Sequence, residues 1–494
     1  MKTLKAAMAC LVMLMTLHTQ TSTAGIHADN SESPTVRTVA TDTDTDKTDN
    51  TASANPTNQL FTTDGDMIIA NVGNTQLSRT GSLDKLLKMI PFVVEVDGNY
   101  QVQGKQHTHI YIDNRRVLNA DELKYLSPLN ISTITIMAHT EANHYAEAEA
   151  VIEIRTIRGA TGLGGSVYAV GGSNSKPTFT GKATLEYNTD KLQLFAGVGH
   201  SEIKHERSST VTIDQSGDRN DISTDERTDY AHYNLNAEAG FNYKANDNNT
   251  LSLHTRVVKE REINDMDLRH RILAADGTMS KADKNDNYVK EYPLKWTTNA
   301  QFDTRIGNTT LAITNDLNMM SIDKTTRSII SADSRLTSEL EMSYVMNTFK
   351  FVATSPITDN ATLRYGAEYT YTHDECETEI ETYNYTPWID DEESERTQNI
   401  LAEFVNFNYR SGIWDISAGV RFEQYKERYT IDDMEMSNVK NDKINHYSNL
   451  TLTVMPTEET FVSLSYRDGV TNQMHNYPYI RREYISEYFY KNDL

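Results

Sequence analysis

Cysteine, positive charge and long apolar runs are all scarce in this chain. It has 494 residues and 2 cysteines, and Cys10 lies within the first apolar run, so removal of that run leaves Cys376. One thiol cannot form a disulfide within the chain, which excludes a cysteine-stapled secreted scaffold. The formal net charge of −23 argues against a nucleic-acid partner, because phosphate binding requires a basic face.

The one long apolar run lies at the amino terminus. Residues 6–17 follow Lys2 and Lys5, and small residues precede position 25. The run is too short to cross a bilayer as a helix, so we interpret residues 1–24 as a secretory signal peptide that is cleaved after Ala24. Because no later run could form a membrane helix, a membrane-spanning form of this chain would have to be a β-barrel.

Two regions of different composition follow the signal peptide. Residues 25–65 are polar and include "TDTDTDKTDNTASANPTNQ", so they predict a disordered leader. Residues 66–160 predict a small α+β domain, with a helix at 82–91 that Ser82 caps and Pro91 ends. A second helix is predicted at 120–126, capped by Asn119. The predicted strands are residues 66–72, 100–104, 109–112, 132–137 and 150–157.

From residue 164 onward the chain alternates between apolar and polar side chains. The alternation is clear in residues 233–243, 361–371 and 414–423. A soluble sandwich also alternates, so the connections decide between the two architectures. Short connections are predicted at residues 188–190, 244–249, 305–308, 355–360, 410–412 and 455–459. Long polar connections are predicted at residues 200–230, 259–293, 320–338, 372–398 and 424–446.

Short and long connections that alternate are typical of an outer-membrane barrel, with short periplasmic turns and long external loops. Strands of about ten residues are long enough to cross the apolar part of the membrane at a tilt. We therefore expect a mainly β fold, in which residues 161–494 form an antiparallel transmembrane β-barrel. Its apolar face would contact lipid and its charged face would line a wet interior.

Several motifs resemble the TonB-dependent outer-membrane receptors, especially the branch common in Bacteroidetes. They are "SLDKLLKMIPFVVEVDGNYQVQGKQHTHIYIDNRRVLNADELKYL", "ISTITIMAHTEANHYAEAEAVIEIRTIRG", "NILAEFVNFNYRSGIWDISAGVRFEQY" and "HYSNLTLTVMPTEETFVSLSYRDGV". The resemblance implies that residues 66–160 are a plug domain that fills a barrel of about twenty-two strands. Three positions depart from the family pattern: Phe92 and Asn114 replace glycines, and His139 replaces a proline.

The resemblance implies active uptake of a nutrient ligand through the outer membrane of a Gram-negative cell. The implied partners are a TonB-type inner-membrane energy transducer, outer-membrane lipid and lipopolysaccharide, and a surface lipoprotein. The alternative is a non-transporting, adhesin-like surface protein or a degenerate receptor fragment. No catalytic motif is present, so we expect no enzyme activity, no catalytic residues and no cofactor.

Four polar residues of the predicted plug are candidates for ligand contact. His107 and His109 alternate along a strand, and Arg115 and Arg116 follow in the next turn. Paired imidazoles at this spacing could bind zinc or copper, but solvated plug residues explain them equally well, so we expect no metal site. The glycine-rich residues 159–172 lead into a strand rather than a helix, which favours a hinge over a phosphate-binding loop.

A further candidate is the contact with the energy transducer. Residues Asp66, Met67, Ile68, Ile69 and Ala70 form a short β-prone run to which a partner strand could add. The same run also suits the first strand of the plug, which we favour.

Counting along the chain gives thirteen barrel strands, of which the last lies near residues 460–466. We therefore expect this sequence to hold about 13 of the 22 strands that the resemblance implies.

Overall fold

The computed structural model describes residues 59–492 with short gaps, so the predicted signal peptide and residues 25–58 lie outside the described residues. The gaps are residues 65–66, 97, 106, 114, 118–122, 124–125, 143, 145–147, 158–160, 214–220, 274–277, 388–389, 436–440, 458–459, 469–481 and 487–488. The helix predicted at 120–126 also falls outside them, apart from Leu123 and Leu126. We call residues 59–157 the N-terminal unit and residues 162–467 the large sheet.

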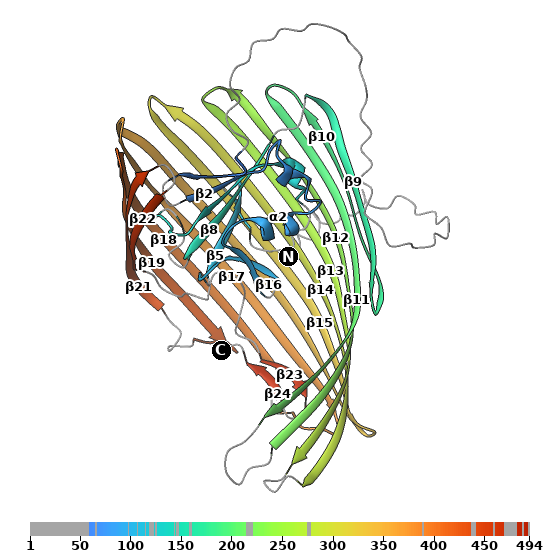
Figure 1. The fold of residues 1–494 in the computed structure, drawn as a ribbon. Helices are drawn as coiled ribbons and strands as arrows, with labels where there is room; N and C mark the ends of the chain where they lie inside the picture. Colours follow the sequence, from blue (N-terminus) through green and yellow to red (C-terminus); the bar gives the residue numbers. More distant parts are fainter. Residues whose placement is uncertain are drawn as a thin grey trace, which may run out of the picture. The chain divides into compact units, whose positions relative to one another are not determined.

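The N-terminal unit is built on a six-stranded mixed sheet (Figure 1). The strand order is β1-β2-β7-β8-β5-β6, and each neighbouring pair is antiparallel except β5 with β8. The strands are β1 (Phe61–Asp64), β2 (Met67–Asn71), β5 (Thr108–Ile112), β6 (Arg115–Arg116), β7 (Ile131–Met137) and β8 (Ala150–Thr156). Among its described residues the unit also contains a hairpin, an α-helix and two 3-10 helices: β3 (Val93–Val96), β4 (Asn99–Val102), α2 (Leu83–Met89), η1 (Gln76–Arg79) and η3 (Pro128–Asn130).

Helix α2 begins where the sequence predicts. The hydroxyl of Ser82 accepts a hydrogen bond from the backbone N–H of Lys85 at 3.2 Å, which satisfies one of the free donors of the first turn. Asp84 lies in that turn and forms an ion pair with Lys88 one turn later, at 2.9 Å. The phenol of Tyr100 on β4 donates to the carboxylate of Asp84 at 2.5 Å. The helix is therefore tied to the hairpin next to it.

The core of the N-terminal unit is apolar and closed to solvent. Helix α2 contributes Leu86 and Leu87, and the sheet contributes Ile134 and Ile152, all with no exposed surface. Burying a side chain of this size stabilises a fold by roughly 1.5–3 kcal/mol. The unit therefore has a core of its own, independent of the large sheet.

Phe92 has an unusual backbone conformation. Its φ angle is 64°, in the left-handed region that glycine adopts without strain, and its side chain is 57% exposed. The carbonyl oxygen of Phe92 accepts a hydrogen bond from the backbone N–H of Gln103 at 2.7 Å, which fixes the entry into hairpin β3–β4. The glycine of the resembling family at this position thus has a structural counterpart, and phenylalanine adopts the same conformation with strain.

Strand β1 corrects the predicted extent of the disordered leader. Residues 61–64 lie within the predicted leader (25–65), yet they pair with β2 in the register Phe61 with Ala70 and Asp64 with Met67. Backbone hydrogen bonds to β2 order this segment even though its sequence, "FTTD", shows little apolar pattern. The mixed sheet therefore begins before residue 66.

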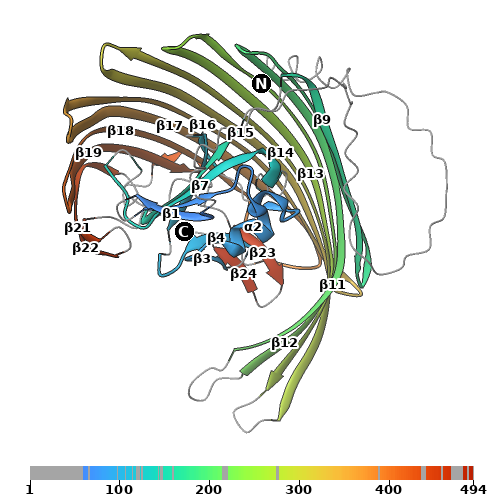
Figure 2. The ribbon, with the colours of Figure 1, turned by 45° about the horizontal axis from the view of Figure 1, so that its top comes forward.

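The large sheet is an antiparallel meander of thirteen strands, with β20 paired beside β19 (Figures 1 and 2). Within the described residues, each strand from β9 to β22 pairs with its neighbours in sequence, apart from β20, in agreement with the predicted count of thirteen. The strands are β9 (Gly162–Asn174), β10 (Lys176–Asn188), β11 (Leu192–Ile213), β12 (Asp221–Asn246), β13 (Asn249–Leu273), β14 (Met279–Ile306), β15 (Thr309–Ser331), β16 (Ser334–Thr358), β17 (Ala361–Tyr383), β18 (Glu392–Ser411), β19 (Trp414–Ile431), β20 (Met434–Glu435), β21 (Asn441–Thr457) and β22 (Thr460–Arg467). A separate hairpin, β23 (Arg482–Ser486) with β24 (Phe489–Asn492), follows.

β9 and β22 are the two edges of this sheet, and within the described part of the chain they do not pair with each other. The sheet is therefore not closed into a complete ring. In the part of the chain that the structure describes, no helix is long and apolar enough to cross a membrane.

The predicted length of the strands and the predicted long connections are wrong. β12 has 26 residues and β14 has 28, so each continues far into the polar segments that the sequence assigned to external connections. Figure 2 shows the ends of the strands around β12 projecting beyond the rest of the sheet. Backbone pairing continues in these polar segments. Each strand there forms its ladder of hydrogen bonds with the two neighbouring strands, and this ladder does not require a buried apolar face. The predicted short turns are confirmed.

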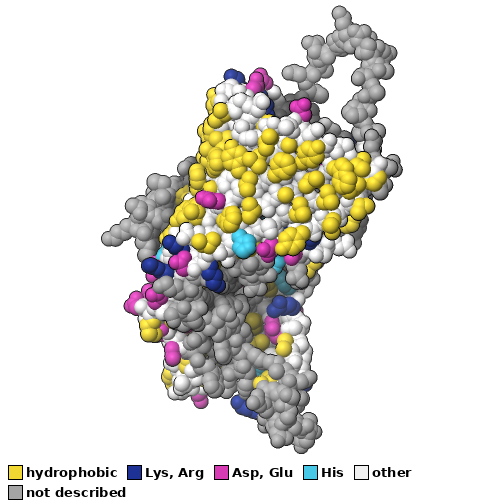
Figure 3. Space-filling model, turned by 90° about the vertical axis from the view of Figure 1, so that its left-hand side faces the viewer, with side chains coloured by type: hydrophobic (Ala, Val, Ile, Leu, Met, Phe, Trp, Pro, Cys, Tyr) yellow, Lys and Arg dark blue, Asp and Glu magenta, His cyan; other side chains and the backbone are white. Residues whose placement is uncertain are grey.

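The two faces of the large sheet differ as predicted. The outer face carries apolar side chains such as Tyr369, Leu401 and Phe422, which are 42–51% exposed. The inner face carries Glu368, Asn406 and Arg421, which are at most 3% exposed. Figure 3 shows apolar side chains gathered in a broad patch that contains few charges. The alternation in sequence therefore corresponds to two chemically different surfaces.

One part of the inner face departs from the expected charged lining. Ile322, Leu340, Met342 and Cys376 pack together and are at most 8% exposed, with Met320 against them. These side chains lie at even positions of β15, β16 and β17, as do the polar residues of the inner face. The lining is therefore mixed rather than uniformly charged.

Candidate functional site

The N-terminal unit contacts the inner face of the large sheet through Glu141. This residue lies in the connection between β7 and β8. Its Oε2 forms an ion pair with Nη1 of Arg364 on β17, and its Oε1 accepts a hydrogen bond from Nδ2 of Asn408 on β18 at 3.2 Å. The two oxygens of one carboxylate are thus bound by donors from two neighbouring strands.

The inner face is closely packed around this contact. Gly419 on β19 lies so close to Ala142 that a Cβ atom added to the glycine would be 3.0 Å from the Cβ of Ala142. The amide of Asn406 donates to Oδ1 of Asn408 at 2.8 Å and to Oγ of Ser417 at 3.0 Å. These bonds orient the amide of Asn408, so that its Nδ2 points to Glu141.

A buried charge network lies nearby on the same face. Arg421 donates to Glu368 at 2.9 Å and to Glu423 at 2.7 Å, and all three side chains are at most 5% exposed. Lys350 on β16 pairs with the second oxygen of Glu368 at 3.2 Å. Buried charges require such partners, because an isolated ion in the interior is strongly destabilising.

His144 lies close to these cations on the side of the N-terminal unit. Its ring meets that of Tyr111 edge to face, with centroids 5.4 Å apart. Desolvation, together with the positive charges of Lys350 and Arg364, holds the pKa of His144 well below its usual range. The imidazole is therefore neutral and adds no further positive charge to the contact.

A second contact lies at the start of the N-terminal unit. Asp64, the last residue of β1, forms an ion pair with Arg410 on β18, and Arg410 also pairs with Asp415 on β19. The side chains of Asp64 and Arg410 are about half exposed. Ion pairs of this kind are weak, so this contact is easier to break than the one at Glu141.

The four predicted ligand-contact residues are only partly brought together. Arg116 donates to Nε2 of His109 at 2.9 Å, which occupies the lone pair that a metal ion would need. His107 precedes β5, and its backbone carbonyl accepts from the backbone N–H of Glu149 at 2.8 Å. The side chain of Arg115 lies outside the described residues. No group of three or more histidine, cysteine or acidic side chains in the described ranges is arranged to hold a metal ion.

The predicted contact with the energy transducer lies mostly in an interior strand. Met67, Ile68, Ile69 and Ala70 belong to β2, whereas Asp66 is not among the described residues. β2 pairs with β1 on one side and with β7 on the other. A partner strand could therefore add to β2 only after β1 leaves.

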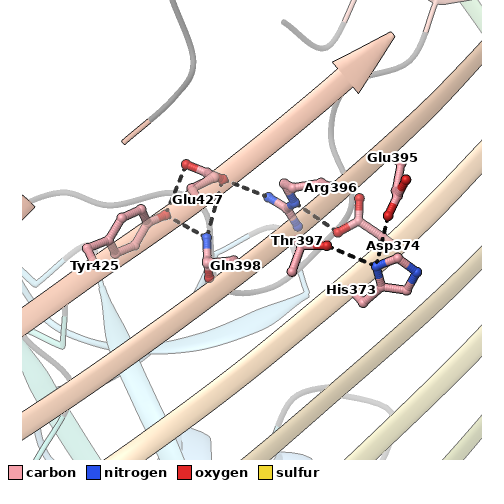
Figure 4. Close-up of polar contacts among 8 residues, drawn as sticks. All are labelled: His373, Asp374, Glu395, Arg396, Thr397, Gln398, Tyr425 and Glu427. Atoms are coloured by element: carbon pink, nitrogen blue, oxygen red, sulfur yellow. Dashed lines mark hydrogen bonds and ion pairs between the residues drawn. The ribbon is translucent and has the colours of Figure 1, made fainter. Parts of the chain in front are cut away.

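A second polar cluster lies further along β17, β18 and β19 (Figure 4). Arg396 donates to Asp374 at 2.8 Å and lies 3.9 Å from Glu427, and all three are buried. Gln398 donates to the hydroxyl of Tyr425 at 2.5 Å, which links β18 to β19. This cluster joins three strands in segments that the sequence assigned to connections.

The contact residues Glu141, Arg364 and Asn408 are not recognisable in the sequence. Glu141 is 223 residues from Arg364 and 267 from Asn408, and no local pattern joins them. The one available signal is position: Arg364 and Asn408 are polar members of strands whose other face is apolar.

A protein-family model and several solved structures are similar to this chain. Residues 295–488 match the model of the outer membrane protein beta-barrel family. The RagAB peptide importer in its closed-closed state has a TM-score of 0.53 at 10% identity, covering 87% of this chain and 63% of that one. The ferripyoverdine receptor of the outer membrane of Pseudomonas aeruginosa has a TM-score of 0.51 at 10% identity, covering 85% and 58%. No curated protein matches the chain by sequence.

The solved structures show the fold of the chain. The chain has the fold of these two solved outer-membrane proteins. Residues 295–488 are, in addition, similar in sequence to an outer-membrane β-barrel family. The chain spans about 60% of the length of the two solved receptors.

Proposed function

We propose that this chain is a receptor for active uptake of a nutrient ligand through the outer membrane, driven by a TonB-type energy transducer. The observation that carries the proposal is the polar contact of the N-terminal unit with the inner face of the large sheet. A plug that is held by a few ion pairs and hydrogen bonds, rather than by a shared apolar core, can be displaced without unfolding either part. The ligands of the similar proteins, ferripyoverdine and peptides, do not identify the ligand of this chain.

Strand β1 is where the transducer would act in this proposal. It is an edge strand of the mixed sheet: it pairs with β2, its Phe61 packs against the core of the N-terminal unit, and its Asp64 forms the half-exposed ion pair with Arg410. A partner strand can add to an edge strand but not to the interior strand β2. Pulling at β1 would first break the weak contact with Arg410 and then load the rest of the unit. A surface lipoprotein remains a candidate partner on the external side.

The experiment is to compare which compounds cells remove from a mixed nutrient medium. Cells that carry the chain, with and without a functional transducer, are compared with cells that lack it, using mass spectrometry of the spent medium. We expect at least one compound to be depleted only when the chain and the transducer are both present. An outer-membrane protein that is correctly inserted but depletes nothing would instead support the adhesin-like alternative.

Proline substitutions localise the contact with the transducer. Thr63→Pro changes the edge strand at a residue whose N–H faces away from β2, so it should abolish uptake while the N-terminal unit stays folded. Ile69→Pro changes the interior strand and should unfold the unit, because proline removes a ladder donor and is not tolerated inside a sheet. Equal loss of folding in both variants would contradict the assignment to β1.

A further inference from the structure

The contact at Glu141 has the features of a binding site for a carboxylate. Its two oxygens are bound separately, Oε2 by the guanidinium of Arg364 and Oε1 by the amide of Asn408. Two donors that converge on the two oxygens of one carboxylate match the geometry of that group, and charge-assisted hydrogen bonds of this kind are the strong ones.

The large sheet itself orients one of these donors. Asn406 donates to Oδ1 of Asn408 at 2.8 Å, which leaves Nδ2 of Asn408 directed at the carboxylate. Asn449 on β21 in turn donates to Oδ1 of Asn406 at 3.3 Å. None of these three residues belongs to the N-terminal unit. The arrangement therefore does not require Glu141 in order to form.

Charge balance also distinguishes Arg364 from the other cations of the inner face. Arg421 pairs with Glu368 and Glu423, and Lys350 pairs with Glu368, so these cations are balanced by carboxylates of the large sheet itself. The ion pair of Arg364 is formed with a carboxylate of the N-terminal unit. Displacement of that unit would leave a partly buried guanidinium beside an oriented amide donor, which favours the binding of another anion.

We propose that Arg364 and Asn408 form a carboxylate-binding site of the barrel wall, which Glu141 occupies in this structure and which a carboxylate of the transported ligand occupies when the N-terminal unit is displaced. This inference rests on the proposed function and gives its ligand a chemical class. One site cannot hold both carboxylates. The ligand therefore stabilises the state in which the N-terminal unit is displaced, by an amount set by the difference between its affinities for the two states.

The test measures binding of propionate to the full chain folded in detergent micelles, by saturation-transfer NMR. In Glu141→Ala the site is vacant, so we expect propionate to bind about tenfold or more tightly than in the unchanged protein, where Glu141 competes. Propionamide has the same shape without the charge and should not bind. Glu141→Gln fills the site with an amide and should bind propionate no better than the unchanged protein.

A second substitution assigns the signal to the proposed residues. Glu141→Ala combined with Arg364→Ala should lose propionate binding, whereas Glu141→Ala combined with Arg428→Ala, on the outer face, should keep it. Binding of inorganic phosphate equal to that of propionate would overturn the assignment to carboxylates. If Glu141→Ala does not fold, Glu141→Ser serves in its place.

The outcome is separate from that of the uptake experiment. Absence of propionate binding in a folded Glu141→Ala protein, or binding that survives the loss of Arg364, would overturn the site even if uptake depends on the transducer. Binding that follows this pattern while no compound is taken up would leave the site and remove the proposed function.

Discussion

The N-terminal unit and the large sheet bury opposite kinds of side chain. In the N-terminal unit, Leu86 and Ile134 are fully buried and the charged residues lie at the surface. In the large sheet, Leu401 is 42% exposed on the outer face while Arg421 is 1% exposed on the inner face. The same residue types thus occupy reversed positions because the surroundings differ: water surrounds a folded plug, whereas lipid surrounds the outer face of a barrel.

Equal burial in the two regions therefore corresponds to different stabilising interactions. The N-terminal unit is stabilised by a dry apolar core, which needs no specific partner for each side chain. The inner face of the large sheet is stabilised by matched charges and amides, and each loss leaves a partner without its bond. Substitutions in the two regions should therefore differ in size and in kind.

The largest effect is expected from Arg421→Ala on the inner face. The substitution leaves Glu368 and Glu423 buried with one cation fewer, which should lower the free energy of unfolding by roughly 3–5 kcal/mol. Urea unfolding of the protein refolded into lipid vesicles measures this value. Arg428→Ala, on the exposed face of the same strand, is the matched control and should change it by less than about 1 kcal/mol. Equal effects at both positions would mean that the charge network contributes nothing specific.

A slightly smaller effect is expected from Leu86→Ala in the core of the N-terminal unit. The truncation leaves a cavity and should destabilise the unit by roughly 2–5 kcal/mol. Hydrogen exchange at the amides of β7 and β8 reports the loss, while exchange in β16 to β18 should not change. Met89→Ala, on the same helix but 56% exposed, should stay within about 0.5 kcal/mol of the unchanged protein. Faster exchange in the large sheet as well would show that the two cores are coupled.

Tyr100→Phe tests a single polar contact in the otherwise apolar N-terminal unit. The hydrogen bond from Tyr100, followed by that from Lys88, lowers the pKa of Asp84 below its usual 3.8. Removal of the phenolic hydroxyl should lower the free energy of unfolding by about 1 kcal/mol at pH 7 and raise the pKa of Asp84. A lowered pKa adds stability above pH 3.8 that is lost as the pH falls through the folded value, so the difference between the two proteins should shrink below that pH. NMR titration of the Asp84 carboxyl carbon measures the change in its pKa, and Tyr466→Phe is the control.

The smallest effect is a stabilisation, expected on the opposite face of the large sheet, where like charges lie opposite each other. Glu377 on β17 lies directly opposite Glu341 on β16 and Glu393 on β18. Like charges opposite each other destabilise a sheet, so Glu377→Gln should raise the stability of this part by about 0.2–1 kcal/mol. The gain should decrease as salt is added, because exposed charges are screened. Glu381→Gln is the control, since Thr337 lies opposite Glu381. A gain of equal size there would rule out cross-strand repulsion as the cause.

Local patterns predicted those features whose cause is local. Ser82 and Pro91 bound the helix because capping and proline act within one turn. The alternation around Arg421 predicted the two faces of the large sheet because side chains alternate along any strand. The outer ends of β12 and β14 escaped prediction because strands that are wet on both faces show no alternation. The contact of Glu141 with Arg364 could not be predicted, because it depends on how two separately folded parts meet.

The meander connectivity of the large sheet has a consequence for how the protein assembles. Each turn whose residues are all described is short and joins strands that are neighbours along the chain. A new hairpin therefore has only a short loop to close. Growth of the sheet can therefore proceed one hairpin at a time between strands that are neighbours along the chain. The N-terminal unit precedes β9 and has a core of its own, so it can fold before the first hairpin is laid down. Pairing between near neighbours in sequence is also the arrangement that folds fastest for a given size.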